Sequence, residues 1–334
     1  NQSNSLSEKS MMQQLLKKHY GFNVNTIHQV ENGVGGETYT IDTDQGVYIL
    51  KRVADNGMNH PQNEPLLVET LVAAGIPVAR FVPTLDREVI WTDDRGQMYH
   101  LQQRILGSIF TAHTAPDWLL WNSARLLGRI HQTLTSLPSL PVGIGDDFFR
   151  LMTPQRAESS YQTSLQWALQ AGEQSIVRDL QYRIKLLPFL QEVTIDIQKF
   201  SRGNTHGDYG IHQIICAENH IQAVIDWTSA CVHPFCWEVI RSFSYAEPSC
   251  RDGVISNVRF QQYLENYLSE YPLSGYDLRM MPYLYMYQLG VSDYYHQYFT
   301  ATTSNRQIFL FQACFSTRLL NWFERHVEDL SRSL

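Results

Sequence analysis

The stretch that decides the fold is His-Gly-Asp-Tyr-Gly-Ile-His-Gln at residues 206–213, with Val-Ile-Asp-Trp-Thr following at residues 224–228. Apolar runs adjoin both stretches, so we expect each carboxylate at a strand end or on a loop. Asp208 and Asp226 are eighteen positions apart, on the two sides of a short hairpin, where they can face one another. Such a pair suits one base and one metal ligand.

The residues upstream of this stretch predict a small region rich in strands. Segments of apolar, β-branched and aromatic residues are bounded by glycines, and Asp-Asp-Arg-Gly between two of them is a hairpin signal. Two other segments have helical apolar spacing, and each ends at a glycine. The expected strands are residues 37–41, 46–53, 87–92 and 97–105, and the expected helices are residues 10–20 and 62–74.

Helices are expected to dominate beyond Gly107. Apolar residues at three-to-four spacing give residues 116–135 one buried face, residues 154–194 predict a helical pair, and residues 256–334 predict further long helices. Two short strands interrupt the helices within residues 201–235. We therefore predict an α+β, bilobal fold: a small β-rich N-terminal lobe at residues 1–106 and a larger helical C-terminal lobe at residues 107–334.

The pattern His-Gly-Asp-x-x-x-x-Gln, with Ile-Asp-Trp after it, resembles the aminoglycoside phosphotransferase and choline kinase-like family, the small-molecule relatives of protein kinases. The resemblance covers nearly the whole chain, because the upstream pieces fall in the order that this fold requires. It implies a protein-kinase-like fold. It also implies transfer of the γ-phosphate of ATP or GTP to a hydroxyl of a small molecule, either an antibiotic or a metabolite.

The resemblance assigns roles to three residues of the C-terminal part. Asp208 is implied to be the catalytic base that accepts the proton of the acceptor hydroxyl, and Asp226 is implied to bind Mg²⁺. Gln213 stands where the family usually carries Asn, as a second metal ligand. Glutamine also offers a carbonyl oxygen, but this oxygen lies one methylene further out.

The N-terminal lobe is implied to bind the nucleotide. Lys51 would contact the α- and β-phosphates, and Glu64 of the following helix would pair with this lysine, with Glu69 as a rival. Residues 33–39 resemble the hairpin that covers the phosphates. Residues 101–107 resemble the hinge, where a backbone carbonyl and an N–H contact the adenine. The implied nucleotide-binding residues are Lys51, Glu64, Gly35, Gly36, Thr38, Gln103 and Ile105.

Three residues near the central stretch are expected to have structural roles. We expect His206 to hold the catalytic loop by hydrogen bonds and His212 to be a surface residue of that loop. Glu238 is expected to cap a helix or to form an internal ion pair, for example with Arg241.

Composition narrows the class of partner. The 334 residues include 43% hydrophobic and 18% charged residues, which is a globular composition. The net charge of -7 argues against nucleic acid as a partner. The first ten residues are polar and no apolar run approaches a membrane span, so we expect a cytoplasmic protein without a membrane partner. We expect a monomer or a homodimer that binds a small-molecule hydroxyl acceptor.

Two other functions compete with small-molecule phosphorylation. A nucleotide-binding pseudokinase or scaffold without transfer activity stays open, because Gln213 replaces the expected asparagine. A protein kinase is disfavoured, because only about ten residues separate Asp226 from the next helix signal at residues 234–238, which leaves no room for an activation segment.

The acceptor itself stays open. An aminoglycoside is cationic and needs an acidic pocket, while choline needs an aromatic cage. The C-terminal region contains both acids and many tyrosines, and homoserine is a further candidate.

Overall fold

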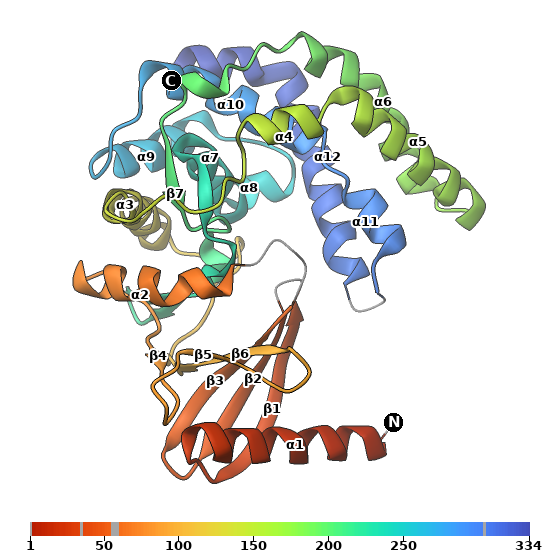
Figure 1. Ribbon diagram of the computed structural model, residues 1–334. Coiled ribbons are helices and arrows are strands. Elements are labelled where there is room, and N and C mark those ends of the chain that lie inside the picture. Colours follow the sequence, from red (N-terminus) through yellow and green to blue (C-terminus); the bar gives the residue numbers. More distant parts are fainter. Residues whose placement is uncertain (1, 34–35, 55–59, 303–304) are drawn as a thin grey trace. The chain divides into compact units, whose positions relative to one another are not determined.

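The computed structural model describes residues 2–33, 36–54, 60–302 and 305–334. These residues divide into two compact units, each of which combines two stretches of the chain (Figure 1). Unit 1 comprises residues 1–108 and 215–230, and unit 2 comprises residues 109–214 and 231–334. The units are described separately below.

The core of unit 1 is an antiparallel sheet with strand order β1-β2-β3-β6-β4, in which β5 also pairs with β6. The predicted strands and the helix at residues 62–74 are present, but two strands were not predicted. In β1 the apolar residues Val24, Ile27 and Val30 recur every three residues rather than every two, and β4 has only two residues, which is too short to show alternation. The elements are α1 (Gln2–Tyr20), β1 (Val24–Gly33), β2 (Gly36–Thr43), β3 (Gly46–Val53), α2 (Glu64–Ala73), β4 (Phe81–Val82), β5 (Ile90–Thr92) and β6 (Met98–Gln103).

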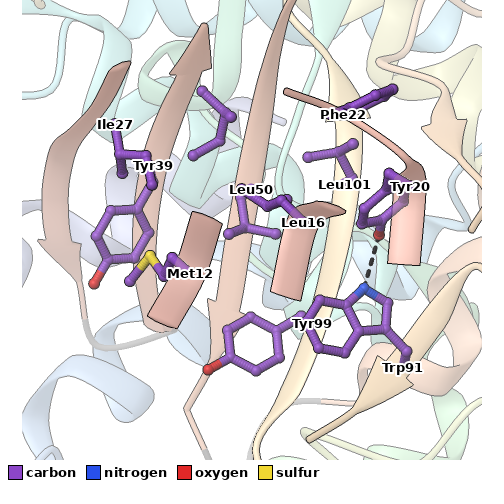
Figure 2. Packing of buried hydrophobic residues seen from close by; sticks show 11 residues of the cluster. Met12, Leu16, Tyr20, Phe22, Ile27, Tyr39, Leu50, Trp91, Tyr99 and Leu101 are labelled. Carbon is purple, nitrogen blue, oxygen red and sulfur yellow. Dashed lines mark hydrogen bonds between the residues drawn. The ribbon is translucent and has the colours of Figure 1, made fainter. Parts of the chain in front are cut away.

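Helix α1 covers one face of this sheet (Figure 2). Met12, Leu16 and Tyr20 recur every four residues, so they lie on one side of the helix, and each is at most 4% exposed. The Tyr20 hydroxyl accepts a hydrogen bond of 2.8 Å from Trp91 Nε1. Each such side chain contributes about 1.5–3 kcal/mol by burial. The helix begins at Gln2 rather than at the predicted residue 10, because polar residues extend a helix without adding to its apolar pattern.

A hairpin from the second half of the sequence completes unit 1. It consists of β8 (Ile214–Ala217) and β9 (His220–Val224). Ser108 and Cys216 exchange backbone hydrogen bonds of 2.8 and 2.9 Å, and Val224 N–H donates to Pro77 at 2.9 Å. These bonds are the reason that residues 215–230 group with unit 1, whereas the expected division assigned them to the lobe of residues 107–334.

Unit 2 is mainly helical, with one short antiparallel pair of strands, β7 and β10. The predicted helix at residues 116–135, the helical pair at residues 154–194 and the C-terminal helices are all present. The elements are α3 (Asp117–Leu134), α4 (Asp146–Leu151), α5 (Pro154–Ala171), α6 (Gln174–Glu192), β7 (Arg202–Thr205), β10 (Cys231–Pro234), α7 (Phe235–Ala246), α8 (Pro248–Arg251), α9 (Asn257–Leu268), α10 (Gly275–Gly290), α11 (Tyr294–Thr300) and α12 (Arg306–Ser333). The α+β composition is as predicted.

A buried arginine ties several helices of unit 2 together. Arg183 of α6 is 1% exposed. Its guanidinium donates to the carbonyl oxygens of Leu289 on α10, at 3.0 Å, and of Ala313 on α12, at 3.1 Å. It also donates to the Tyr161 hydroxyl on α5, at 3.2 Å. Because a buried cation needs a polar partner for each N–H, this network fixes the register of four helices.

Among the helices of the described ranges, none is both long enough and apolar enough to cross a bilayer.

Candidate functional site

Lys51 and Asp226 form an ion pair inside unit 1. Lys51 lies on β3 and is 8% exposed. Its Nζ lies 2.5 Å from Asp226 Oδ1 and 3.3 Å from Thr228 Oγ1, and the Thr228 hydroxyl also donates to Asp226 Oδ1 at 2.6 Å. Asp226 has a φ of 60°, a left-handed conformation that costs a non-glycine residue about 1–3 kcal/mol. The turn after β9 holds the carboxylate against the lysine despite that cost.

Glu64 differs from its predicted role as the partner of Lys51. It is the first residue of α2 and is 1% exposed, and its Oε1 lies 3.4 Å from His100 Nε2. His100 is the cross-strand neighbour of Lys51 between β3 and β6. The lysine ammonium instead contacts the carboxylate of Asp226. Glu69, the rival candidate, is exposed.

The predicted phosphate-covering hairpin joins β1 to β2. Gly36 has a φ of 133°, and a Cβ added there would lie 2.2 Å from the Arg52 carbonyl oxygen, so only glycine fits. Thr38 pairs with Lys51 across β2 and β3. Gly35 lies outside the described residues. That these residues contact phosphates stays a prediction.

The predicted hinge follows β6. Gln103 is the last residue of that strand, and its N–H donates to the Arg80 carbonyl at 3.0 Å. Ile105 lies two residues further on, outside any helix or strand. Gly107, with a φ of 147°, passes so near β8 that a Cβ would lie 2.3 Å from the Cys216 carbonyl oxygen. The segment is therefore held at its C-terminal end, while adenine binding by Gln103 and Ile105 stays a prediction.

In unit 2, the loop that carries Asp208 begins after β7. His206 is fully buried, and its Nδ1 accepts a hydrogen bond of 3.2 Å from the Asp208 N–H. This contact agrees with the structural role that we expected for His206. The loop ends in a short 3₁₀ helix at Ile211–Gln213, which turns the Gln213 side chain back toward Asp208.

Glu238 of α7 holds the backbone of this loop by hydrogen bonds. Its side chain is fully buried and accepts hydrogen bonds of 2.7 Å from the Gly207 N–H and 2.8 Å from His131 Nε2. Longer bonds of 3.3 and 3.4 Å come from the N–H groups of His206 and Tyr209. Burial tends to raise the pKa of Glu238, but the hydrogen bond from His131, together with the neighbouring His206 and His233, outweighs burial and lowers that pKa. Glu238 is thus an anion that positions the loop.

Three donors surround the carboxylate of Asp208. Arg241 Nη2 lies 2.6 Å from Oδ1, while Gln213 Nε2 lies 2.9 Å and His212 Nε2 lies 3.3 Å from Oδ2. Desolvation tends to raise the pKa of Asp208, but the Arg241 charge and the His212 hydrogen bond outweigh it and hold this pKa well below its usual range. Arg241 therefore pairs with Asp208, and the suggested Glu238–Arg241 pair was wrong.

Sequence reasoning missed Arg241 and His212 as partners of Asp208. The signal for Arg241 was available, because it is the one cation of α7, a helix in which all the other residues are buried. A cation in such a helix needs an anion or polar groups as partners. His212 gave no signal, because its side chain is 41% exposed and its contact depends on the loop conformation.

Each of the two predicted metal ligands has a side chain whose chemistry suits Mg²⁺. Mg²⁺ prefers carboxylate and carbonyl oxygens, and it commonly uses one or two carboxylates together with substrate phosphates. Asp226, in unit 1, offers a carboxylate, and Gln213, in unit 2, offers an amide oxygen; that the two hold one ion stays a prediction. Since the Gln213 amide nitrogen donates to Asp208, its oxygen points elsewhere. In the described part of the chain, no group of three or more His, Cys, Asp or Glu side chains could hold a metal ion.

Comparisons with known proteins agree with the predicted fold. The model of the family described as "Phosphotransferase enzyme family" matches residues 26–272. A spectinomycin phosphotransferase solved with ADP and spectinomycin is 14% identical, with a TM-score of 0.63 over 97% of this chain and 98% of that one. An amicoumacin kinase solved with AMP-PNP and Ca²⁺ is 16% identical, with a TM-score of 0.64 over 96% and 93%.

An aminoglycoside phosphotransferase from Alicyclobacillus acidocaldarius is 17% identical, with a TM-score of 0.60 over 95% and 96% of the two chains. No curated protein matches this chain. At these identities the solved structures confirm the predicted fold.

Proposed function

The chain belongs to the phosphotransferase enzyme family, and on that premise we propose that it moves the γ-phosphate of ATP or GTP to a hydroxyl of a small molecule, an antibiotic or a metabolite. The observation that carries the proposal is the setting of Asp208. Its carboxylate accepts hydrogen bonds from Arg241, Gln213 and His212, and it lies on a loop whose backbone is bonded to Glu238. A carboxylate fixed in this way can orient an acceptor hydroxyl.

Asp208 acts on the acceptor in this proposal. The acceptor oxygen bonds to the γ-phosphorus, its proton passes to the Asp208 carboxylate, and the bond from the γ-phosphorus to the β–γ bridging oxygen breaks, so that a nucleoside diphosphate leaves. The low pKa of Asp208 makes it a weak base. Its main contribution is therefore orientation, which suits the loose transition state of phosphoryl transfer.

Lys51 binds the phosphates of the nucleotide in this proposal. Its side chain is buried on β3, and its ammonium lies 2.5 Å from the Asp226 carboxylate, where a phosphate oxygen would be a further strong partner. Mg²⁺, held by Asp226 and Gln213, would neutralise charge on the phosphates. We propose that Glu64, which is buried beside His100, supports the nucleotide-binding part of the site.

A small acceptor is favoured over a protein. Only residues 227–234 separate Asp226 from α7, and they are occupied by a short 3₁₀ helix and β10. Protein kinases use a long segment at this point to dock and regulate peptides. The chain has no comparable segment in these described residues.

The test is a panel of small hydroxyl acceptors assayed by nucleoside diphosphate release, with ATP and with GTP. Asp208→Ala should abolish transfer and leave nucleotide binding nearly intact, whereas Asp226→Ala should weaken binding of the Mg²⁺–nucleotide itself. If the Asp208→Ala protein turns over as fast as the wild type, Asp208 is not the catalytic base. Nucleotide-induced thermal stabilisation that ignores Mg²⁺, without transfer to any acceptor, would favour a pseudokinase.

A further inference from the structure

Arg241 combines a bond to the proposed base with an unusual environment. Nη2 holds Asp208 Oδ1 at 2.6 Å, and only 15% of the arginine side chain is exposed. The guanidinium carbon lies 4.6 Å from the ring centre of Tyr245 and 5.5 Å from that of Trp237, both on α7. Aromatic faces attract the cation but offer no strong hydrogen-bond acceptor. The arginine is therefore fixed in place while part of its donor capacity stays unused.

The unused donor is Nη1. In the structure as described, Nη1 of Arg241 is buried and has no hydrogen-bond partner. Buried donors without a partner are rare and unfavourable, and in native proteins they often mark a functional position. Since the neighbouring nitrogen of the same planar group is on Asp208, an oxygen bonded to Nη1 would lie beside the carboxylate that receives the acceptor hydroxyl.

The charges near Asp208 disfavour a cationic acceptor. The groups that act most strongly on the Asp208 charge are the cation Arg241 and the histidines His212 and His206. Four acidic residues of the C-terminal region that could have formed an acidic pocket already have other partners. Glu238 bonds to His131, Glu247 pairs with Arg259, Asp277 accepts from the backbone of Ser201 and Ser274, and Asp293 accepts from Gln297.

We propose that Arg241 selects the acceptor: the substrate is a small hydroxy acid whose carboxylate binds Arg241 Nη1 while its hydroxyl meets Asp208. This inference rests on the function proposed above and narrows its substrate class. Guanidinium groups bind carboxylates by directed, charge-assisted hydrogen bonds, which a lysine cannot reproduce with the same geometry. Because Nη1 is shielded from solvent, binding must displace part of the side chains around it.

The acceptor pairs for the test differ only at the proposed contact. The probes are homoserine against homoserine amide, and 4-hydroxybutyrate against 4-hydroxybutyramide, with 4-amino-1-butanol as the cationic compound. Transfer is followed by nucleoside diphosphate release, and binding by calorimetry with a non-hydrolysable nucleotide. For the wild type we expect kcat/KM to favour each carboxylate over its amide roughly 100-fold.

Two variants of Arg241 separate selection from mere support of Asp208. Arg241→Met and Arg241→Lys should both lose the carboxylate preference, whereas loss of support alone would lower kcat for acid and amide equally. Arg259→Lys is the matched control, because Arg259 also binds carboxylates and lies over a tryptophan ring, but its bonds go to Glu247 and Asp117. Melting curves show whether each variant is folded.

The outcomes distinguish the two proposals. A wild type that transfers equally well to amides or to the amine, or a preference that survives in a folded Arg241→Met protein, overturns the assignment of Arg241 and leaves the phosphotransferase function standing. Carboxylates that bind the wild type but not Arg241→Met, with no transfer to any acceptor, support the Arg241 site and reject the proposed function. Carboxylates that neither bind nor react, while another acceptor is phosphorylated, also overturn the assignment.

Discussion

Replacing Glu238 by glutamine tests how the loop of Asp208 is held. The amide can still accept from the Gly207 N–H, and His131 can change tautomer to accept from the new amide group. What is lost is the negative charge behind the two short bonds of 2.7 and 2.8 Å. A hydrogen bond to a charged group contributes about 1.5–3 kcal/mol and a neutral one about 0.5–1.5. Two such bonds predict a loss of about 2–3 kcal/mol in the free energy of unfolding at pH 7.

The pH dependence of the free energy of unfolding provides a second, independent test of this prediction. The folded pKa of Glu238 lies below its ordinary value of 4.5, so its stabilisation is complete above that pH and is lost as pH falls through the folded pKa. The difference between wild type and Glu238→Gln should therefore shrink as pH falls below 4.5. Urea unfolding followed by circular dichroism measures both quantities.

A charge control separates this effect from a general loss of negative charge. Glu265 is exposed on α9, and Glu265→Gln should change the free energy of unfolding by less than about 0.5 kcal/mol. Turnover of Glu238→Gln should also fall by roughly tenfold. A poorly held loop places Asp208 less well, and a rise of about 1.4 kcal/mol in the activation free energy slows a reaction tenfold. A Glu238→Gln protein as stable as the control at pH 7 would refute the anchoring role.

Three further predictions concern other parts of the chain. Gly36→Ala should lower the stability of unit 1 by about 1–3 kcal/mol, because alanine cannot easily adopt a φ of 133°, and an unchanged melting temperature would contradict this. Arg183→Met should cost about 3 kcal/mol or more, since it removes the charge-assisted hydrogen bonds to Leu289 and Ala313, and urea unfolding would show it. His233 is buried, and burial lowers its pKa from 6.5 to about 4, so its contribution of roughly 3 kcal/mol is present above pH 6.5 and is lost as pH falls toward 4. His233→Gln should flatten that part of the stability profile, and an unaltered profile would count against it.

The sequence predicted the elements better than their long-range contacts. Asp208 on its loop, Lys51 on a strand and Asp226 just after a strand were all placed from local patterns, because strand and turn signals are local. The bond between Arg241 and Asp208 spans 33 positions, and no periodicity reports such a contact.

The partner of Glu64 shows the same limit. A buried glutamate at the start of a helix was recognisable, but whether it meets Lys51 or His100 depends on side chains from three elements. The role of Glu238 was foreseen as internal, yet its bonds to loop N–H groups follow from the backbone path of residues 206–209, which the sequence does not describe.

The discontinuous make-up of unit 1 has a consequence for how the chain acquires its structure. Lys51 meets Asp226 across 175 positions, and the hairpin of residues 214–224 must return to the region of Ser108. During synthesis, a ribosome must therefore translate about two thirds of the chain before this ion pair can form. Such high contact order slows folding. Until then, the first hundred residues lack the hairpin that completes unit 1. We therefore expect unit 1 to depend more on chaperones than unit 2, and to misfold first when translation stops early.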